Sequence, residues 1–141
     1  MKESLERFIE AQSEDYQLAL SEIESGVKRT HWMWFIFPQI AGLGLSTTSQ
    51  FYAIRDLEEA TAYLRHEILG TRLIEISAAL LQLPTNNAHQ IFGSPDDMKL
   101  QSSMTLFSLV ESTPPIFQKV LDKFFNGEPD QKTIQLLNSQ R

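Results

Sequence analysis

The segment HWMWFIFPQ, His31 to Gln39, places six large apolar side chains in a row between an imidazole and a proline. A continuously apolar segment of this length is typical of chain that is buried on all sides. It is far too short to span a bilayer. Burial in the core is therefore a sufficient explanation for Met33, Phe35, Ile36 and Phe37.

The six apolar side chains cannot all share one environment. If residues 32–37 are helical, successive side chains are rotated by about 100°, so some of them face away from the core. Trp32 and Trp34 each carry an indole N–H that needs a partner when buried, and each has a flat face on which a base or a sugar can stack. We predict that Trp34 forms one wall of a pocket, and that the core takes Phe35 with at least one of Met33, Ile36 and Phe37.

The composition narrows the class of protein. The chain has 141 residues, 42% of them hydrophobic, which fits one globular domain over residues 1–141. Cysteine is absent, which excludes disulfides, thiolate zinc sites and a cysteine nucleophile. The N-terminal sequence MKESLERFIEAQ is charged and amphipathic rather than an apolar signal core. The net charge of -6 repels a phosphate backbone. We expect a cytoplasmic protein with no membrane segment and no nucleic-acid partner.

Helical spacing of apolar residues recurs through the first half of the chain. It appears twice before Gly26, which predicts two helices divided at Ser13, or one bent helix. Asp56, with a carboxylate three residues later, has the pattern of an N-cap and begins a helix that stops near Gly70. A further helix ends before Pro84, because the residue preceding a proline disfavours the helical conformation. Its inward side chains are expected to be Leu73, Ile76, Leu80 and Leu81.

The second half of the chain shows the clearest helix starts. Residues 94–97, Ser-Pro-Asp-Asp, combine a hydroxyl cap, a proline at the first helical position and two acids in the first turn, and predict a helix to about Glu111. Thr113 and the two prolines after it begin another helix that ends at Gly127, and a short helix at residues 133–137 closes the chain. No hairpin turn and no sustained two-residue alternation is found. The predicted fold class is all-α, with about seven helices and no significant sheet.

Four strings of the sequence carry a resemblance to a known family: HWMWFIFPQIAGLG, FYAIRD with EATAYLRHEILGTRL, IFGSPDDMKLQSSMTLF and FFNGEPDQKTIQLL. In this order they resemble the motifs of a bacterial family of small all-α proteins of unknown function, some of which are labelled calpastatin in genomes. The resemblance covers nearly the whole chain and implies a compact helical domain, but no activity. The label carries no weight, because calpastatins are long, disordered protease inhibitors of different composition.

Basic and flexible residues flank the aromatic segment. His31 lies just after Arg29 and is a candidate ligand contact or general acid/base, because histidine is the side-chain type suited to proton transfer near neutral pH. The alternative is an ordinary histidine at a helix start. Gly42 and Gly44 allow the backbone to approach a ligand closely, and the hydroxyls that follow can face an anion. Ordinary turn and cap chemistry explains the glycine segment equally well. Tyr52 is a further candidate ligand contact.

Two more clusters offer polar side chains. Arg55 can bind a carboxylate or a phosphate through parallel hydrogen bonds, or it can pair with the acids of its own helix. The helix that starts at Pro95 has a polar stripe on one face, because its members are three or four residues apart. The stripe consists of Asp96, Lys99, Ser102 and Ser103. Lys99 and Ser103 have the spacing of a lysine-activated serine, although in the reverse order of the known S-x-x-K motif.

These motifs together suggest one kind of ligand. A pocket with aromatic walls and cationic edges suits a small anion that carries a flat group, such as a nucleotide or a sugar phosphate. The expected contacts are Arg29, His31, Trp32, Trp34, Gly42, Gly44, Tyr52, Arg55, Lys99, Ser102 and Ser103. Hydrolytic chemistry on that ligand would fall to His31, Asp96, Asp97, Lys99 and Ser103.

Two further expectations concern partners. The histidines of the chain are dispersed and no paired carboxylates join them, so we expect no metal and no cofactor. A single site requires five side chains to point into one cleft, namely His31, Trp34, Arg55, Lys99 and Ser103. The alternative function is a protein-interaction module that uses an exposed aromatic or apolar patch.

Overall fold

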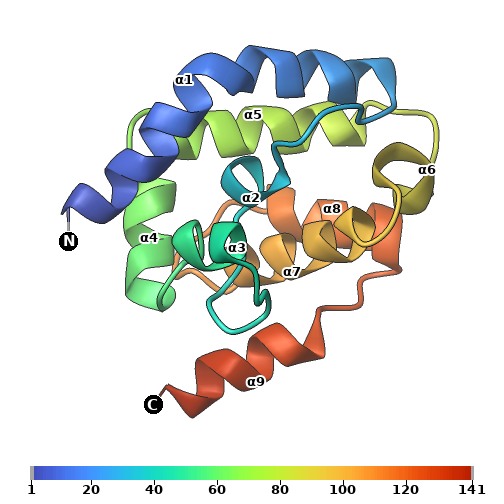
Figure 1. Ribbon diagram of the computed structural model, residues 1–141. Helices are drawn as coiled ribbons and strands as arrows, with labels where there is room; N and C mark the ends of the chain where they lie inside the picture. Colours follow the sequence, from blue (N-terminus) through green and yellow to red (C-terminus); the bar gives the residue numbers. More distant parts are fainter. Residues whose placement is uncertain (1, 141) are drawn as a thin grey trace.

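A computed structural model describes residues 2–140 of the chain, with side chains from residue 5 onward. The described residues form nine α-helices: α1 (Lys2–Ser25), α2 (Met33–Ile36), α3 (Thr47–Phe51), α4 (Leu57–Arg65), α5 (Leu69–Leu81), α6 (Ala88–Phe92), α7 (Asp96–Ser108), α8 (Ile116–Phe125) and α9 (Gln131–Ser139). Figure 1 shows α1 and α5 side by side along one edge, α2 enclosed between them and α7, and α9 at the opposite edge. The β pairing within this range is one isolated bridge between Ile40 and Ile54, so the all-α fold class is confirmed.

The number of helices differs from the expected seven for two reasons. The first two expected helices are one helix, α1, which changes direction along its length in Figure 1. Ser13 does not cap a second helix, because its hydroxyl donates to the carbonyl oxygen of Glu10 in the preceding turn. The short helices α2, α3 and α6 have four or five residues each, which is too short to produce a helical repeat in the sequence.

The predicted helix starts are confirmed at one position and wrong at two. The Oδ1 atom of Asp56 accepts a hydrogen bond from the backbone N–H of Glu59 at 2.8 Å, as an N-cap does. The N-caps of α7 and α8 are Pro95 and Pro115 themselves, so neither Ser94 nor Thr113 caps a helix. Both predictions failed because the helices begin later than the first-turn proline pattern implies, α7 by one residue and α8 by two.

The junction between α4 and α5 depends on a glycine. The helix expected to reach Gly70 ends at Arg65, and Gly70 lies inside α5. A Cβ atom at Gly70 would lie 1.9 Å from the carbonyl oxygen of Leu64. Glycine at this position therefore lets the first turn of α5 contact the last turn of α4.

The prediction that Phe35 and at least one of its three apolar neighbours lie in the core is confirmed. Phe35 is 7% exposed and Trp32 is 1% exposed, whereas Trp34 is half-buried. The other buried members of the segment are Met33, Ile36 and Phe37. The inward residues Leu73, Ile76 and Leu80 of α5 are also buried, and Leu81 is half-buried.

A buried amide ties α2 to the helices around it. The Nε2 atom of Gln12 in α1 donates to the carbonyl oxygen of Phe35 at 2.7 Å and to the hydroxyl oxygen of Tyr63 in α4 at 2.9 Å. Burial raises the pKa of the Tyr63 phenol, which stays protonated. None of the helices in the described range is both long and apolar enough to cross a bilayer.

Candidate functional site

The turn that leads into α2 is organised by one buried carboxylate. The Oε1 atom of Glu22 accepts hydrogen bonds from the backbone N–H of Arg29 at 2.8 Å, from the backbone N–H of Thr30 at 3.1 Å and from Nε1 of Trp32 at 2.8 Å. Its Oε2 atom accepts from the Thr30 hydroxyl at 2.8 Å. Burial by itself raises the pKa of Glu22, but these hydrogen bonds outweigh it and lower the pKa to about 2. Glu22 is thus a structural anion that satisfies the buried indole.

This turn places three of the expected ligand contacts in different environments. Trp32 is enclosed in the core, with its indole N–H bonded to Glu22. Arg29 and His31 are exposed, and neither side chain lines the cavities described below.

A cluster of charges lies at the start of α7. The Oδ2 atom of Asp96 is 2.9 Å from Nζ of Lys28, and its Oδ1 atom is 3.5 Å from Nζ of Lys99. Lys28 also lies over the ring of Trp32, and Lys99 lies over the ring of Trp34 at 5.6 Å from its centre. The cluster therefore joins two lysines to the aromatic segment through cation–π contacts.

Asp97 lies outside this cluster. Its Oδ2 atom is 3.4 Å from Nδ1 of His89, so the two acids of the first turn of α7 have different partners. The pair is an ion pair only when the imidazole is protonated.

A cavity of about 390 Å³ lies beside Lys99, between α7, α9 and the loop after α2. We refer to it as the lysine cavity. Two cations from different helices, Lys99 and Lys132, line it. The remaining lining residues are Gln39, Leu43, Gly44, Pro95, Met98, Ser102 and Asp130.

The one carboxylate of the lysine cavity is held in place by hydrogen bonds. The Oδ2 atom of Asp130 accepts from the Ser102 hydroxyl at 3.0 Å, and from the backbone N–H and the hydroxyl of Thr133 at 3.1 and 2.6 Å. Asp130 is the N-cap of α9, and these bonds attach α9 to α7. Because Ser102 donates to Asp130, its hydroxyl is part of this attachment.

Trp34 and Tyr52 line a second, much smaller cavity, of about 10 Å³, that shares Gln39 and Gly44 with the lysine cavity. This volume holds about one water molecule. Trp34 thus lines a cavity, but one with no room for a base or a sugar ring. One face of its ring is covered by Lys99.

The prediction of one shared cleft is wrong. Arg55 lines a separate cavity of about 290 Å³ beside α4, where its Nη2 atom is 3.4 Å from Oε2 of Glu59. Ser103 is fully buried, and its Oγ atom has no hydrogen-bond partner among the described residues. Lys99 and Ser103 are four residues apart, but Ser103 is one turn further from the start of α7 and lies inside the core. His31 is exposed and does not line any of these cavities.

The glycine segment is accounted for by packing and capping. Gly42 has φ +104°, and a Cβ atom there would lie 3.1 Å from Cδ2 of Leu136 in α9. A Cβ atom at Gly44 would lie 2.4 Å from Cβ of Ser49. The Ser46 hydroxyl oxygen caps α3 by accepting from the backbone N–H of Ser49 at 3.1 Å. These contacts favour the turn and cap interpretation over a phosphate-binding loop.

Sequence reasoning missed the residues that α9 brings to the lysine cavity. Asp130 has a recognisable signal, since an acid three residues before Thr133 has the pattern of an N-cap. Lys132 has none, because its position depends on how α9 packs. Across the described residues, no three histidine, aspartate or glutamate side chains gather closely enough to hold a metal ion.

These features define a class: an all-α protein that encloses an aromatic core and carries its cavities at the ends of its helices. The chain belongs to the family described as Protein of unknown function (DUF1810), whose sequence model matches residues 2–137. It is similar to the solved structure of the conserved hypothetical protein Rv1873 from Mycobacterium tuberculosis. The two chains are 45% identical, 95% of this chain and 96% of that chain are covered, and the TM-score is 0.93. No curated protein matches the chain. The resemblance to a family of unknown function is therefore confirmed.

Proposed function

We propose that this protein binds a small anion of the size of a sugar phosphate in the lysine cavity. The observation that carries the proposal is that Lys99 of α7 and Lys132 of α9 line one cavity of about 390 Å³, in a chain whose net charge is -6. This volume falls within the range of small-molecule pockets. An acidic chain that turns two lysines toward one cavity offers a local field suited to a negative ligand.

The lining of the cavity supports a ligand with a charged end and a less polar body. Gln39 adds an amide that can donate hydrogen bonds, next to the two ammonium groups. Leu43 and Met98 form an apolar wall on the same cavity, and Met98 is 63% exposed. The charge of Asp130 opposes an anion, but its Oδ2 atom already accepts three hydrogen bonds.

The geometry favours a sugar phosphate over a nucleotide. A base would be expected to stack on Trp34, yet the cavity beside that ring has a volume of about 10 Å³. Of the five residues considered for hydrolysis, Lys99 lines the lysine cavity. Asp96, in the first turn of α7, contacts Lys99. The proposal is therefore one of binding.

A thermal-shift and calorimetric titration tests the proposal, with inorganic phosphate, glucose 6-phosphate, AMP and uncharged glucose as probes. A probe at about a hundred times its dissociation constant stabilises the folded protein by about 2.7 kcal/mol. We expect this from glucose 6-phosphate in the wild type and its loss in Lys132→Ala. Lys119→Ala removes an exposed lysine from α8 and is the matched control. Equal binding by wild type and Lys132→Ala, or no stabilisation by any phosphate, contradicts the proposal.

A second function, docking of a protein partner, is favoured by a different surface. Two large apolar side chains around α3 are open to solvent: Leu45 is 87% exposed and Phe51 is 56% exposed. Both residues flank or belong to one short helix, and large exposed apolar side chains are a feature of interaction surfaces. Photo-crosslinking from position 45, with position 119 as the control, tests this function. A discrete crosslinked species from position 45 alone supports it, and identical patterns from both positions contradict it.

A further inference from the structure

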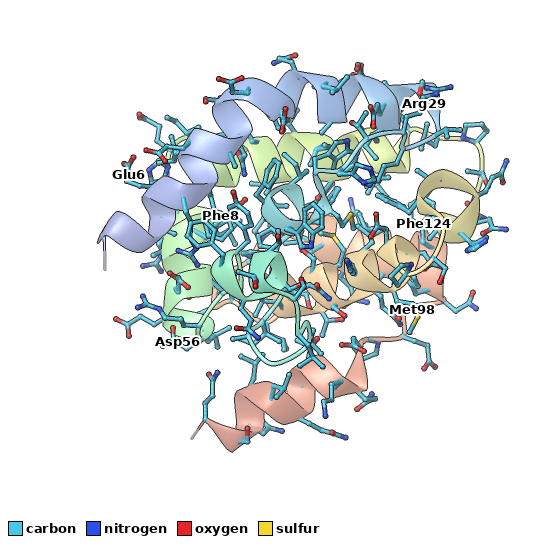
Figure 2. All side chains as sticks on the ribbon, in the orientation of Figure 1. Glu6, Phe8, Arg29, Asp56, Met98 and Phe124 are labelled. Carbon is cyan, nitrogen blue, oxygen red and sulfur yellow. The ribbon has the colours of Figure 1, made fainter. Side chains whose placement is uncertain are left out.

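A pocket of about 410 Å³ lies where three helix ends meet, at the start of α4 and at the C-terminal ends of α7 and α9. We call it the helix-end pocket. Figure 2 labels Asp56 at the end of α4 that faces α9, which marks its position. The lining residues are Asp56, Leu57, Glu58, Leu109, Ile134, Leu137, Asn138 and Gln140.

Helix α9, which forms one side of the pocket, is attached to the rest of the protein at both of its ends. Its first turn is attached to α7 through Asp130 and through Thr133, which is fully buried. At its other end, the amide of Gln140 donates to the carbonyl oxygen of Arg55 at 2.7 Å. Between these attachments Leu136 and Leu137 pack against the core, and Ile134, Leu137 and Asn138 line the helix-end pocket.

Four aliphatic side chains form the walls of the helix-end pocket. Leu57, Ile134 and Leu137 are half-buried, and Leu109 is 44% exposed. Large aliphatic groups left open to water within a concave surface favour a ligand with an apolar body.

Three helices, α4, α7 and α9, bring negative charge or partial negative charge to the lining of the pocket. Asp56 and Glu58 bring carboxylates from the start of α4. Leu109 and Gln140 are the C-cap residues of α7 and α9, so the negative ends of two helix dipoles meet at the pocket. Within the described residues, neither helix has a basic residue in its last turn.

The positive end of α4 also faces this region, but its own acids offset it. The Oδ1 atom of Asp56 accepts from the backbone N–H of Glu59, and both Glu58 and Glu59 lie in the first turn. No lysine or arginine lines the pocket among the described residues. The charge preference is thus opposite to that of the lysine cavity.

We propose that the helix-end pocket binds an organic cation with an apolar body, of the class of alkylammonium or arylalkylammonium compounds. The ammonium group lies beside Glu58 and the last carbonyl oxygens of α9, and the apolar body lies between Leu57, Leu109 and Leu137. The volume of about 410 Å³ suits a small molecule rather than the flat contact of a protein partner. The proposal is independent of anion binding at Lys99 and Lys132.

Amide-shift NMR of the full chain tests the proposal with three probes of similar shape. These are phenethylammonium, the neutral 2-phenylethanol and the anionic 3-phenylpropionate. We expect saturable shifts at the amides of Leu57, Leu109 and Leu137, with phenethylammonium binding at least about threefold more tightly than 3-phenylpropionate. Equal or tighter binding of the anion overturns the proposal, and so does the absence of saturable shifts at these amides.

Two variants separate the contribution of charge from that of apolar contact. Glu58→Gln weakens phenethylammonium by about threefold or more and leaves 2-phenylethanol unchanged, because only a charge is removed. Leu109→Ala weakens all three probes alike, and the exposure of Leu109 makes this variant safe for folding. Glu14→Gln, at an exposed acid on α1, is the control and changes nothing. If Glu58→Gln weakens the binding of 2-phenylethanol as much as the binding of phenethylammonium, the role of charge is overturned. If the wild type dimerises with increasing concentration and Leu109→Ala abolishes this, the pocket is the binding surface of a second copy and the proposal is overturned.

Discussion

Replacing Glu22 with glutamine is expected to cost about 3 kcal/mol of unfolding free energy at neutral pH. The carboxylate accepts four hydrogen bonds at the turn before α2, three of them on Oε1. A glutamine keeps one carbonyl oxygen for the three N–H donors, including Nε1 of Trp32. Its amide group then faces the Thr30 hydroxyl, which must turn to accept a hydrogen bond. The variant therefore folds, but without the charge-assisted bonds.

The magnitude follows from the pKa of Glu22, which falls from 4.5 to about 2 in the folded protein. Each unit corresponds to about 1.4 kcal/mol, which gives about 3 kcal/mol. Because the pKa is lowered on folding, the unfolded chain binds protons first as the pH falls. The stabilisation is complete above the unfolded pKa of 4.5 and disappears as the pH falls through about 2. Of the difference between wild type and Glu22→Gln, about 2 kcal/mol is lost between pH 6 and pH 3.

Urea unfolding at pH 3, 4, 5 and 6, followed by tryptophan fluorescence, measures this difference directly. Glu24→Gln removes an exposed carboxylate from the same helix and is the control, with an expected change within about 0.5 kcal/mol. A difference between wild type and Glu22→Gln that stays constant from pH 3 to pH 6 would refute the reasoning. A difference below about 1 kcal/mol at pH 6 would refute it as well.

Three other predictions concern packing. Phe35→Ala is expected to lower the unfolding free energy by about 3 to 5 kcal/mol, and Trp34→Ala by less, because Trp34 is half-buried. Equal losses of unfolding free energy in urea titrations would place both rings in the core. Gly70→Ala should lower the unfolding free energy by more than about 2 kcal/mol, since its Cβ would lie 1.9 Å from a carbonyl oxygen. Gly93→Ala costs about 1 kcal/mol, because Gly93 has φ +71° but open space around it. Similar melting temperatures for the two variants would contradict this. Ser103→Ala should leave the stability unchanged or raise it, because the buried hydroxyl has no partner in the described range; calorimetry showing a loss above about 1 kcal/mol would disprove that.

The all-α class could be predicted because helical periodicity and caps are local properties of a sequence. Asp56 shows this, since its cap bond joins atoms three residues apart. The burial of Phe35 was also predictable, because a continuous apolar run has no polar face to turn toward water. The three short helices were not predictable, since four or five residues form a helix only when surrounding packing supports them.

The candidate site was only partly predictable, because a cavity depends on which helix ends come together. The sequence by itself determined that Lys99 and Ser102 share a face of α7 and that the chain is acidic, since both are properties of spacing and composition. Only the tertiary structure decided that Lys132 joins Lys99, that Arg55 lines a separate cavity, and that Ser103 faces the core. The physical reason is that residues far apart in the chain meet through packing of whole helices, and their relative placement is set by the shape of the shared core rather than by any local pattern.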